Sequence, residues 1–299
     1  MKKAIIDLGT NTFNLLIATV TSSGFSIIEA DRIAVAIGQG GINKGIITEE
    51  AIERALNALV QFKAVCDKFQ VDSVRAIGTS AIRDAKNKRE FCERVFERTN
   101  INIEVIDGEK EADLIYKGVK WSHDFMEPAV IMDIGGGSTE FIFANKSGVL
   151  DQISLNIGVA RIADLQEFSD PLTPEEVDVI ENWLEQQAGA YFENKTCAKL
   201  IGASGSFETF YELLHQLDFP AEIVTFDLPI NELKQLLSHL IFSTENDRKN
   251  NRWIATIRKK MVPIAAVKVN WIIKKLNIKE VSVSSCSLKE GALMDETSA

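Results

Sequence analysis

The feature that most constrains the fold of this chain is a motif that occurs twice, first around Asp7 and again around Asp133. The first copy reads KAIIDLGTNTF at 3–13, and the second reads AVIMDIGGGST at 129–139. Each copy consists of an apolar run, an aspartate, a glycine turn and a hydroxyl residue, and each leads into a second apolar run and another glycine-containing turn. This pattern predicts a β-hairpin at the start of each half of the chain.

A second pair of segments repeats at nearly the same separation. SVRAIGTS at 73–80 and AKLIGASG at 198–205 are both apolar runs that end in a glycine and small polar residues before a helical pattern. The two motif aspartates are 126 residues apart, and Gly78 and Gly202 are 124 residues apart. Because two different features recur at almost the same separation in sequence, we infer an internal duplication.

Capped helices occupy matching places in the two halves. Residues 48–69 contain the start TEEAIERAL, and residues 171–192 contain the equivalent start TPEE. Strands followed by helix, strand and helix predict two α/β domains that face each other across a cleft. We place the first domain at residues 1–121 and the second at 122–286, and we expect 287–299 to form a helical segment that packs back onto the first.

Composition narrows the classes of partner. The chain has 299 residues and a formal net charge of −10, which argues against nucleic acid and against an anionic membrane surface as the main partner. Its four cysteines are too widely spaced for a zinc motif or a CxxC redox pair, and the chain has no run of 18 apolar residues. The start MKKAIIDLGTN is not a secretory signal. We therefore expect a cytoplasmic protein with no membrane partner and no nucleic-acid partner.

The glycines of the second motif match neither familiar nucleotide loop. A GxGxxG turn leads directly into a helix, whereas Gly135, Gly136 and Gly137 lead into the strand-like run FIFA. The P-loop pattern GxxxxGK(S/T) is also absent from the sequence. A glycine turn in a hairpin can still present successive backbone amides to an anion. We expect the two turns to hold a phosphate from opposite sides; the alternative is two ordinary hairpin turns.

Carboxylates flank these turns at Asp7, Asp133 and Glu140. They would repel a phosphate unless a divalent cation lay between, so we expect Mg²⁺ with Asp133 as its leading ligand; the alternative is that the aspartates cap turns. A proton acceptor must come from elsewhere, and IDGEKEADLIYKGV places Glu109 and Glu111 in the first turn of a predicted helix. Acidic residues in the first turn of a helix often do no more than interact favourably with the helix dipole. Residue spacing alone therefore leaves the assignment of the base open.

Six segments together resemble one family. DLGTNTFNLLIA, GTSAIRDAKN, IDGEKEADLIYKGV, DIGGGSTEF, LNIGVARI and IGASGS occur in the order found in the exopolyphosphatase and guanosine pentaphosphate phosphatase (Ppx/GppA) family. The chain is similar to the short, two-domain form of that family. The resemblance implies a duplicated actin-like ATPase (ribonuclease H-like) fold whose domains face an interdomain cleft. It also implies a hydrolase of the terminal phosphoanhydride bonds of inorganic polyphosphate or guanosine pentaphosphate.

The resemblance assigns roles to individual residues. Glu111 corresponds to the catalytic base that orients the attacking water, and Arg83 to a cleft arginine that stabilises phosphate charge. Asp133 and Glu140, helped by Asp7, correspond to the acids that organise Mg²⁺ or another divalent cation such as Mn²⁺. The implied substrate-binding residues are Gly9, Thr10, Asn11, Thr12, Thr79, Ser80, Gly135, Gly136, Gly137, Ser138, Thr139 and Arg161.

The chain also departs from the family pattern. Ala36 stands where members tend to have a basic residue, and Ala265 and Val267 stand where an arginine and an aspartate are usual. Residues 248–275 carry nine lysines and arginines with no acid between them. This run predicts a track for a polyanionic chain, although most such runs are solvated faces.

Three classes of function remain open from the sequence. We favour a Mg²⁺-dependent hydrolase that acts on polyphosphate or guanosine pentaphosphate as its small-molecule or polyanion partner. The rivals are an ATPase or kinase of the same fold and a non-catalytic binder of polyphosphate or (p)ppGpp. The second rival rests on the missing arginine and aspartate, whose loss would leave binding without catalysis. A homodimer is compatible with the sequence and is left open.

Overall fold

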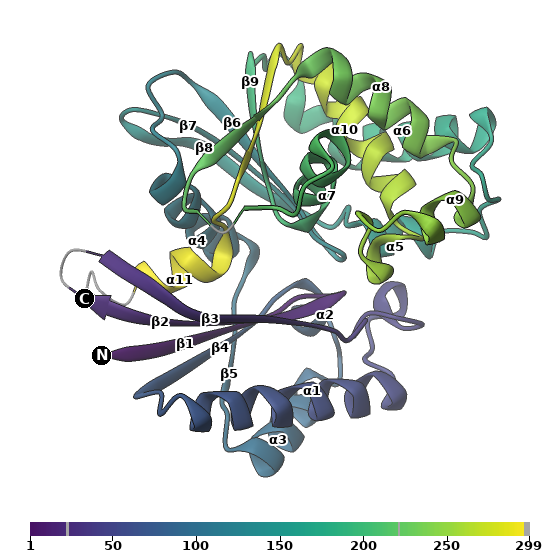
Figure 1. The fold of residues 1–299 in the computed structure, drawn as a ribbon. Coiled ribbons are helices and arrows are strands. Elements are labelled where there is room, and N and C mark those ends of the chain that lie inside the picture. Colours follow the sequence, from purple (N-terminus) through teal and green to yellow (C-terminus); the bar gives the residue numbers. More distant parts are fainter. Residues whose placement is uncertain (22–23, 221, 296–299) are drawn as a thin grey trace.

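The computed structural model describes residues 1–21, 24–220 and 222–295, which form the two α/β halves seen one above the other in Figure 1. The sheet of the first half has the strand order β3-β2-β1-β4-β5. Its strands are β1 (Lys2–Leu8), β2 (Thr12–Thr21), β3 (Gly24–Ala34), β4 (Ser73–Gly78) and β5 (Ile103–Val105). Its helices are η1 (Ile42–Lys44), α1 (Glu49–Lys68), α2 (Ser80–Arg83) and α3 (Lys88–Thr99).

The sheet of the second half has the order β10-β11-β9-β6-β7-β8. Its strands are β6 (Ala129–Ile134), β7 (Thr139–Asn145), β8 (Gly148–Leu155), β9 (Lys199–Ala203), β10 (Thr225–Leu228) and β11 (Glu280–Ser284). Its helices are α5 (Val159–Ala163), α6 (Pro174–Ala188), η2 (Gly189–Phe192), α7 (Gly205–His215), α8 (Ile230–Ile241), α9 (Glu245–Asn250), η3 (Thr256–Arg258) and α10 (Val262–Leu276).

Strand pairing repeats between the halves, as the duplicated motif predicts. β1 pairs with β2 antiparallel and with β4 parallel, and β6 pairs with β7 antiparallel and with β9 parallel. The predicted helix starts are also present, because Thr48 caps α1 and Thr173 forms a capping box with Glu176 at α6. The predicted α/β fold of two facing halves is therefore confirmed.

Two helices lie between the sheets. α4 (Gly108–Ser122) follows the first half, and α11 (Leu288–Asp295) ends the described chain. They cross at close range because Gly118 and Gly291 lack side chains: a Cβ on Gly118 would lie 1.9 Å from the carbonyl oxygen of Ser287, and one on Gly291 would lie 1.8 Å from that of Leu114. Residues 296–299 of the predicted C-terminal segment lie outside the described residues.

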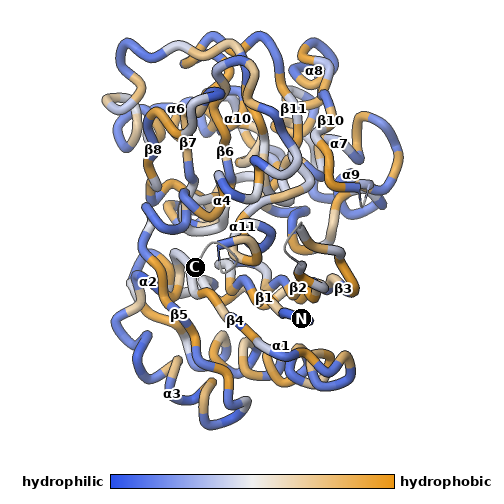
Figure 2. Tube along the Cα trace, turned by 90° about the vertical axis from the view of Figure 1, so that its left-hand side faces the viewer, coloured by the Kyte–Doolittle hydropathy of each residue, from blue (hydrophilic) through white to orange (hydrophobic). Residues whose placement is uncertain are grey.

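The α4–α11 pair shares a hydrophobic core with both sheets. Ile5 and Ile77 of the first sheet and Ile131 and Ile201 of the second contribute to this core, together with Leu288 of α11. Apolar colouring in Figure 2 follows strands such as β1 and β4, whereas α1 alternates between apolar and hydrophilic residues. Within the described ranges, we find no helix with the length and apolarity needed to cross a bilayer.

Candidate active site

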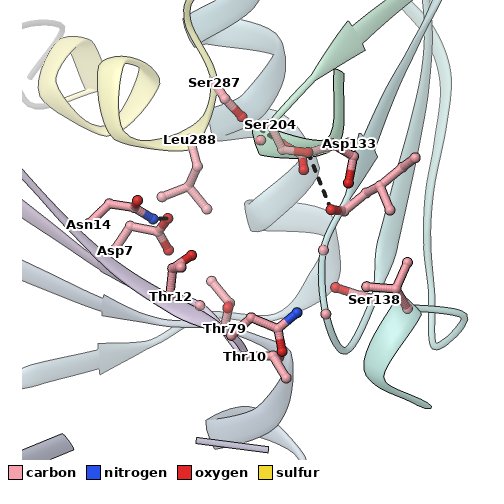
Figure 3. Close-up of a pocket in the computed structure, with 18 of the residues that line it drawn as sticks. Asp7, Thr10, Thr12, Asn14, Thr79, Asp133, Ser138, Ser204, Ser287 and Leu288 are labelled. Carbon is pink, nitrogen blue, oxygen red and sulfur yellow. Dashed lines mark hydrogen bonds between the residues drawn. The ribbon is translucent and has the colours of Figure 1, made fainter. Parts of the chain in front are cut away.

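The two glycine turns meet across the cleft between the halves. A Cβ on Gly136 would lie 2.8 Å from the carboxamide of Asn11, and one on Gly137 would lie 2.5 Å from Ser80 Oγ and 2.8 Å from Thr10 Oγ1. Only glycine allows this approach. Figure 3 shows Asp7, Thr10 and Thr79 on the side of the first half, facing Asp133, Ser138 and Ser204 of the second.

The carbonyls of the second turn are held by the start of α5. Backbone amides of residues 158–160 donate to the carbonyls of Gly137, Gly135 and Gly136 at 3.2, 3.1 and 2.8 Å, respectively. In a trans peptide, the N–H points away from the C=O of the same unit. The amides of residues 136–138 therefore point away from α5, on the side that lines the cleft.

The first turn has the same arrangement with different donors. The carbonyl of Asn11 accepts from the amides of Val35 and Ala36 at 3.1 and 2.8 Å, and that of Thr10 accepts from Gly38 at 3.3 Å. The following amides are consequently directed away from this loop, as at the second turn. Both turns thus direct successive backbone amides away from the groups that hold their carbonyls, and their binding of an anion stays a prediction.

Five carboxylates line the cleft: the predicted Asp7, Glu111, Asp133 and Glu140, and also Glu208, which is paired with arginines. Burial raises the pKa of Asp7 to about 6 and that of Glu140 to about 7. Burial also raises the pKa of Asp133, and it raises the pKa of Glu111 well above its ordinary value, with a further contribution from the charge of Glu140. The site therefore gathers negative charge that is costly to keep ionised without a cation.

Hydroxyl and amide donors orient these carboxylates. Asn14 Nδ2 donates to Asp7 at 3.0 Å, and Ser154 Oγ donates to Glu140 at 2.7 Å. Ser287, which joins β11 to α11, donates through Oγ to Asp133 at 2.5 Å. These bonds favour the charged forms and partly oppose the effect of burial.

The predicted base and the predicted cleft arginine contact each other. Glu111 is in the first turn of α4 and 6% exposed, and its Oε2 accepts from Arg83 Nη1 at 2.6 Å. Arg83 also donates to the carbonyl of Ile106 at 3.4 Å, and it is not among the residues that line the cleft. Direct contact between Arg83 and phosphate therefore stays a prediction that would require it to leave Glu111.

Arg161 lies beside the turns and bridges the two halves. Its Nε donates to the carbonyl of Gly137 at 2.7 Å, and its guanidinium forms an ion pair with Asp84 and reaches Ser80 Oγ at 3.5 Å. It does not line the cleft. Its predicted role in substrate binding remains a prediction, while the geometry gives it a role in holding the turns together.

The other predicted binding residues divide into two groups. Thr139 is completely buried and faces Lys268 rather than the cleft. The remaining ones line the cleft: Gly9, Thr10, Asn11, Thr12, Thr79, Ser80, Gly135, Gly136, Gly137 and Ser138.

Several charged cleft residues lie outside the predicted set. Arg32 of β3 and Arg258 of η3 both contact Glu208 of α7, at 3.1 and 3.2 Å, and Lys289 lies 3.0 Å from Glu290. The pair Arg32–Glu208 joins the two halves. Strand register could have identified Arg32, because it is aligned with Asn14, which is aligned with Asp7.

The basic run at 248–275 does not form the predicted track. Arg248 is buried and paired with Asp170, and Lys268 is buried in the core. The window 248–275 contains no acids, but acids outside it pair with Arg258, Lys249, Lys274 and Lys275, namely Glu208, Glu245, Glu181 and Glu185, respectively. The track hypothesis is therefore wrong for the run as a whole, because it considered neighbours in sequence only.

The positions that depart from the family pattern have different surroundings. Ala265 lines the cleft next to Met261 and Val262, so this wall is apolar. Val267 belongs to the core of the second half. Ala36 has a φ of 49° and supports the first glycine turn through its amide.

The chain is similar to known proteins in both sequence and structure. A sequence profile of the Ppx/GppA phosphatase family matches residues 16–299. The structure of an exopolyphosphatase from Cytophaga hutchinsonii superposes with a TM-score of 0.96 at 33% identity, and the match covers 100% of this chain and 98% of that one. The agreement confirms the predicted duplicated actin-like fold.

Curated relatives are longer than this chain. A guanosine-5'-triphosphate,3'-diphosphate pyrophosphatase of Aeromonas salmonicida is 27% identical over 296 residues, which cover 97% of this chain and 58% of that protein. A bifunctional 3-dehydroquinate synthase/phosphatase of Fusobacterium nucleatum is 40% identical over 171 residues, which cover 54% of this chain and 26% of that protein. The chain thus spans less than two thirds of the length of either relative.

Proposed function

The chain belongs to the Ppx/GppA phosphatase family, and we propose that it hydrolyses the terminal phosphoanhydride bond of inorganic polyphosphate or guanosine pentaphosphate. One observation carries the proposal: two glycine turns from opposite halves meet across a cleft that the carboxylates of Asp7, Glu111, Asp133 and Glu140 also line. Backbone amides on both sides suit the oxygens of a phosphate, and the carboxylates suit a cation and a base. The exopolyphosphatase and the pyrophosphatase among the relatives support this substrate class.

The donor set fits a divalent cation such as Mg²⁺. Asp133 and Glu140 lie opposite each other on β6 and β7, and a hard cation would offset the cost of ionising both, with Asp7 across the cleft as a further donor. Among the described residues, no three acidic, histidine or cysteine side chains form a complete metal cage. Such a set suits Mg²⁺, which keeps waters and binds substrate phosphates. When bound, the cation would neutralise charge on the phosphate oxygens.

Glu111 would orient the attacking water and accept its proton. A base must be deprotonated to act, and both burial and the charge of Glu140 raise the pKa of Glu111. The guanidinium of Arg83 opposes this by lowering the pKa of Glu111 and thus favours the carboxylate. We therefore propose that Arg83 lowers the pKa of Glu111 and holds its carboxylate in place through their hydrogen bond.

The amides of the two turns would stabilise the charge on the transferring phosphate. They are fixed in advance by their carbonyl hydrogen bonds, so little reorganisation is needed during reaction. The ion pairs Arg32–Glu208 and Arg161–Asp84 each connect the two halves. They favour a closed cleft, which would exclude water molecules other than the nucleophile.

One assay separates this function from its rivals. We expect wild-type protein with Mg²⁺ to release phosphate from long polyphosphate or guanosine pentaphosphate faster than from ATP, with the three substrates tested side by side. An ATPase or kinase of the same fold would act faster on ATP. A non-catalytic binder would bind polyphosphate and release no phosphate, and either result would contradict the proposal.

A further inference from the structure

We propose that Lys268 is a positioning residue that holds the second glycine turn in its phosphate-binding shape. Lys268 is on α10 and is completely buried. Its Nζ donates to Thr139 Oγ1 and to the carbonyl of Ile157. It does not line the cleft, so any effect on catalysis must pass through these partners. The inference rests on the proposed function, because its main measurement is phosphate release.

The two partners of Lys268 support the second turn from opposite ends. Thr139 begins β7, and its Oγ1 donates to the carbonyl of Ser138, the last residue of the turn, at 2.9 Å. Ile157 precedes Gly158, whose amide donates to the carbonyl of the third glycine of the turn at 3.2 Å. One ammonium group thus links the strand that leaves the turn to the helix start that holds its carbonyls.

The charge of Lys268 is expensive where it lies. Burial lowers the pKa of Lys268 to about 7, and the nearby charge of Glu140 acts in the opposite direction. No salt bridge to Lys268 is formed by any carboxylate in the described part of the chain. An apolar side chain of similar length would cost less at a purely structural position. The ammonium is therefore kept for the turn, which its two hydrogen-bond partners support.

Other side chains of α10 do not supply this contact. Ala265 and Val267 carry no charge, and Lys274 and Lys275 lie at the end of the helix, paired with Glu181 and Glu185. Lys268 is therefore the cation that α10 places at the glycine turn.

The test compares Lys268→Met with Lys274→Met, an exposed lysine on the same helix. We expect Lys268→Met to lower kcat/KM for polyphosphate by about 10- to 100-fold, because the supports of Thr139 and Ile157 are lost, while resistance to denaturant stays equal or rises. Lys274→Met should leave kcat/KM within about twofold. The stabilisation of the folded protein by inorganic phosphate, measured as a shift in Tm, should be smaller in Lys268→Met than in wild type.

A double-mutant cycle with Thr139→Val tests the route of the effect. If Lys268 acts through Thr139, the double variant should be no worse than Lys268→Met alone. A folded Lys268→Met with wild-type kcat/KM and a wild-type phosphate response would overturn the inference, as would losses that add fully in the double variant. Failure of wild-type protein to release phosphate would instead count against the proposed function, and the phosphate-dependent Tm shift would still test Lys268.

Discussion

The two glycine turns are copies of one hairpin, but different groups support them. At the first turn, the carbonyls of Thr10 and Asn11 accept from amides of the loop at 35–38. Arg54 supports this turn only indirectly. Its guanidinium donates to the carbonyls of Val35 and Ala36 in that loop, at 2.7 and 2.9 Å, and not to the turn itself. The first turn is therefore held mainly by neutral backbone groups.

At the second turn, a positively charged side chain contacts the turn itself, in addition to neutral backbone amides. The start of α5 holds the turn's carbonyls, Arg161 donates to the carbonyl of Gly137, and Lys268 donates to Thr139 at the start of the next strand. This is also the half that carries the opposed pair Asp133 and Glu140. We therefore predict that negative charge on the substrate concentrates at the second turn and that the first turn closes the other side of the cleft.

Among changes to the turns and their supports, the largest effect is expected from a methyl group placed between the turns. In Gly137→Ala the new Cβ would meet Ser80 and Thr10 of the opposite half, whereas in Gly9→Ala it would lie 2.9 Å from the carbonyl of Thr12 in its own turn. We expect Gly137→Ala to lower kcat/KM by about 100-fold or more and to exceed the effect of Gly9→Ala. Steady-state kinetics on folded variants, checked by denaturant unfolding, would make the comparison; equal losses would show that only local turn shape matters.

A smaller effect is expected from the arginines that support the turns. Arg161→Met removes a donor to the second turn and an interdomain ion pair, so we expect a loss of about tenfold in kcat/KM. Arg54→Met acts one peptide further from its turn and should cost about twofold to threefold. The same phosphate-release assay tests both, and an Arg54→Met loss equal to or greater than that of Arg161→Met would contradict the asymmetry.

The smallest effect should come from the donors to the carboxylates, and it should depend on pH. Ser154→Ala removes a hydrogen bond that favours the charged form of Glu140, whose pKa is already raised to about 7. The pKa of Glu140 should rise further, so protons should compete better with Mg²⁺ near pH 7. We expect the Mg²⁺ concentration for half-maximal activity at pH 7 to rise by about threefold, and the difference to disappear above about pH 9.

The matching change in the first half is Asn14→Ala, which affects Asp7. Because the pKa of Asp7 is raised only to about 6, its variant should show a smaller shift in Mg²⁺ requirement at pH 7 and a larger one near pH 6. A Mg²⁺ requirement independent of pH in both variants would remove these carboxylates from cation binding.

Much of the fold could be predicted from the sequence because its signals are local. The repeated apolar run, aspartate and glycine turn define the same hairpin in each half, and the threonine caps mark the starts of α1 and α6. The position of α4 between the sheets depends on a crossing with α11, a segment more than 160 residues away in sequence. Glycine spacing within one helix does not reveal such a contact.

The site was less predictable because its charges are paired across the fold. The family resemblance points to Glu111, which does line the cleft, but its contact with Arg83 brings together side chains from different elements. The basic run misled for the same reason, since the partners of its cations come from α6, α7 and elsewhere. Lys268 carried no sequence signal beyond its place in that run.

The most direct test of the account is phosphate release by Glu111→Gln beside wild type, with long polyphosphate and Mg²⁺. Glutamine keeps the shape of the side chain and removes its ability to accept the proton of water, while both turns stay in place. We predict a loss in kcat of about 10²- to 10⁴-fold with polyphosphate binding retained, measured as kcat and as Kd. Wild-type turnover in folded Glu111→Gln would contradict the assignment of Glu111 as the base between the two turns.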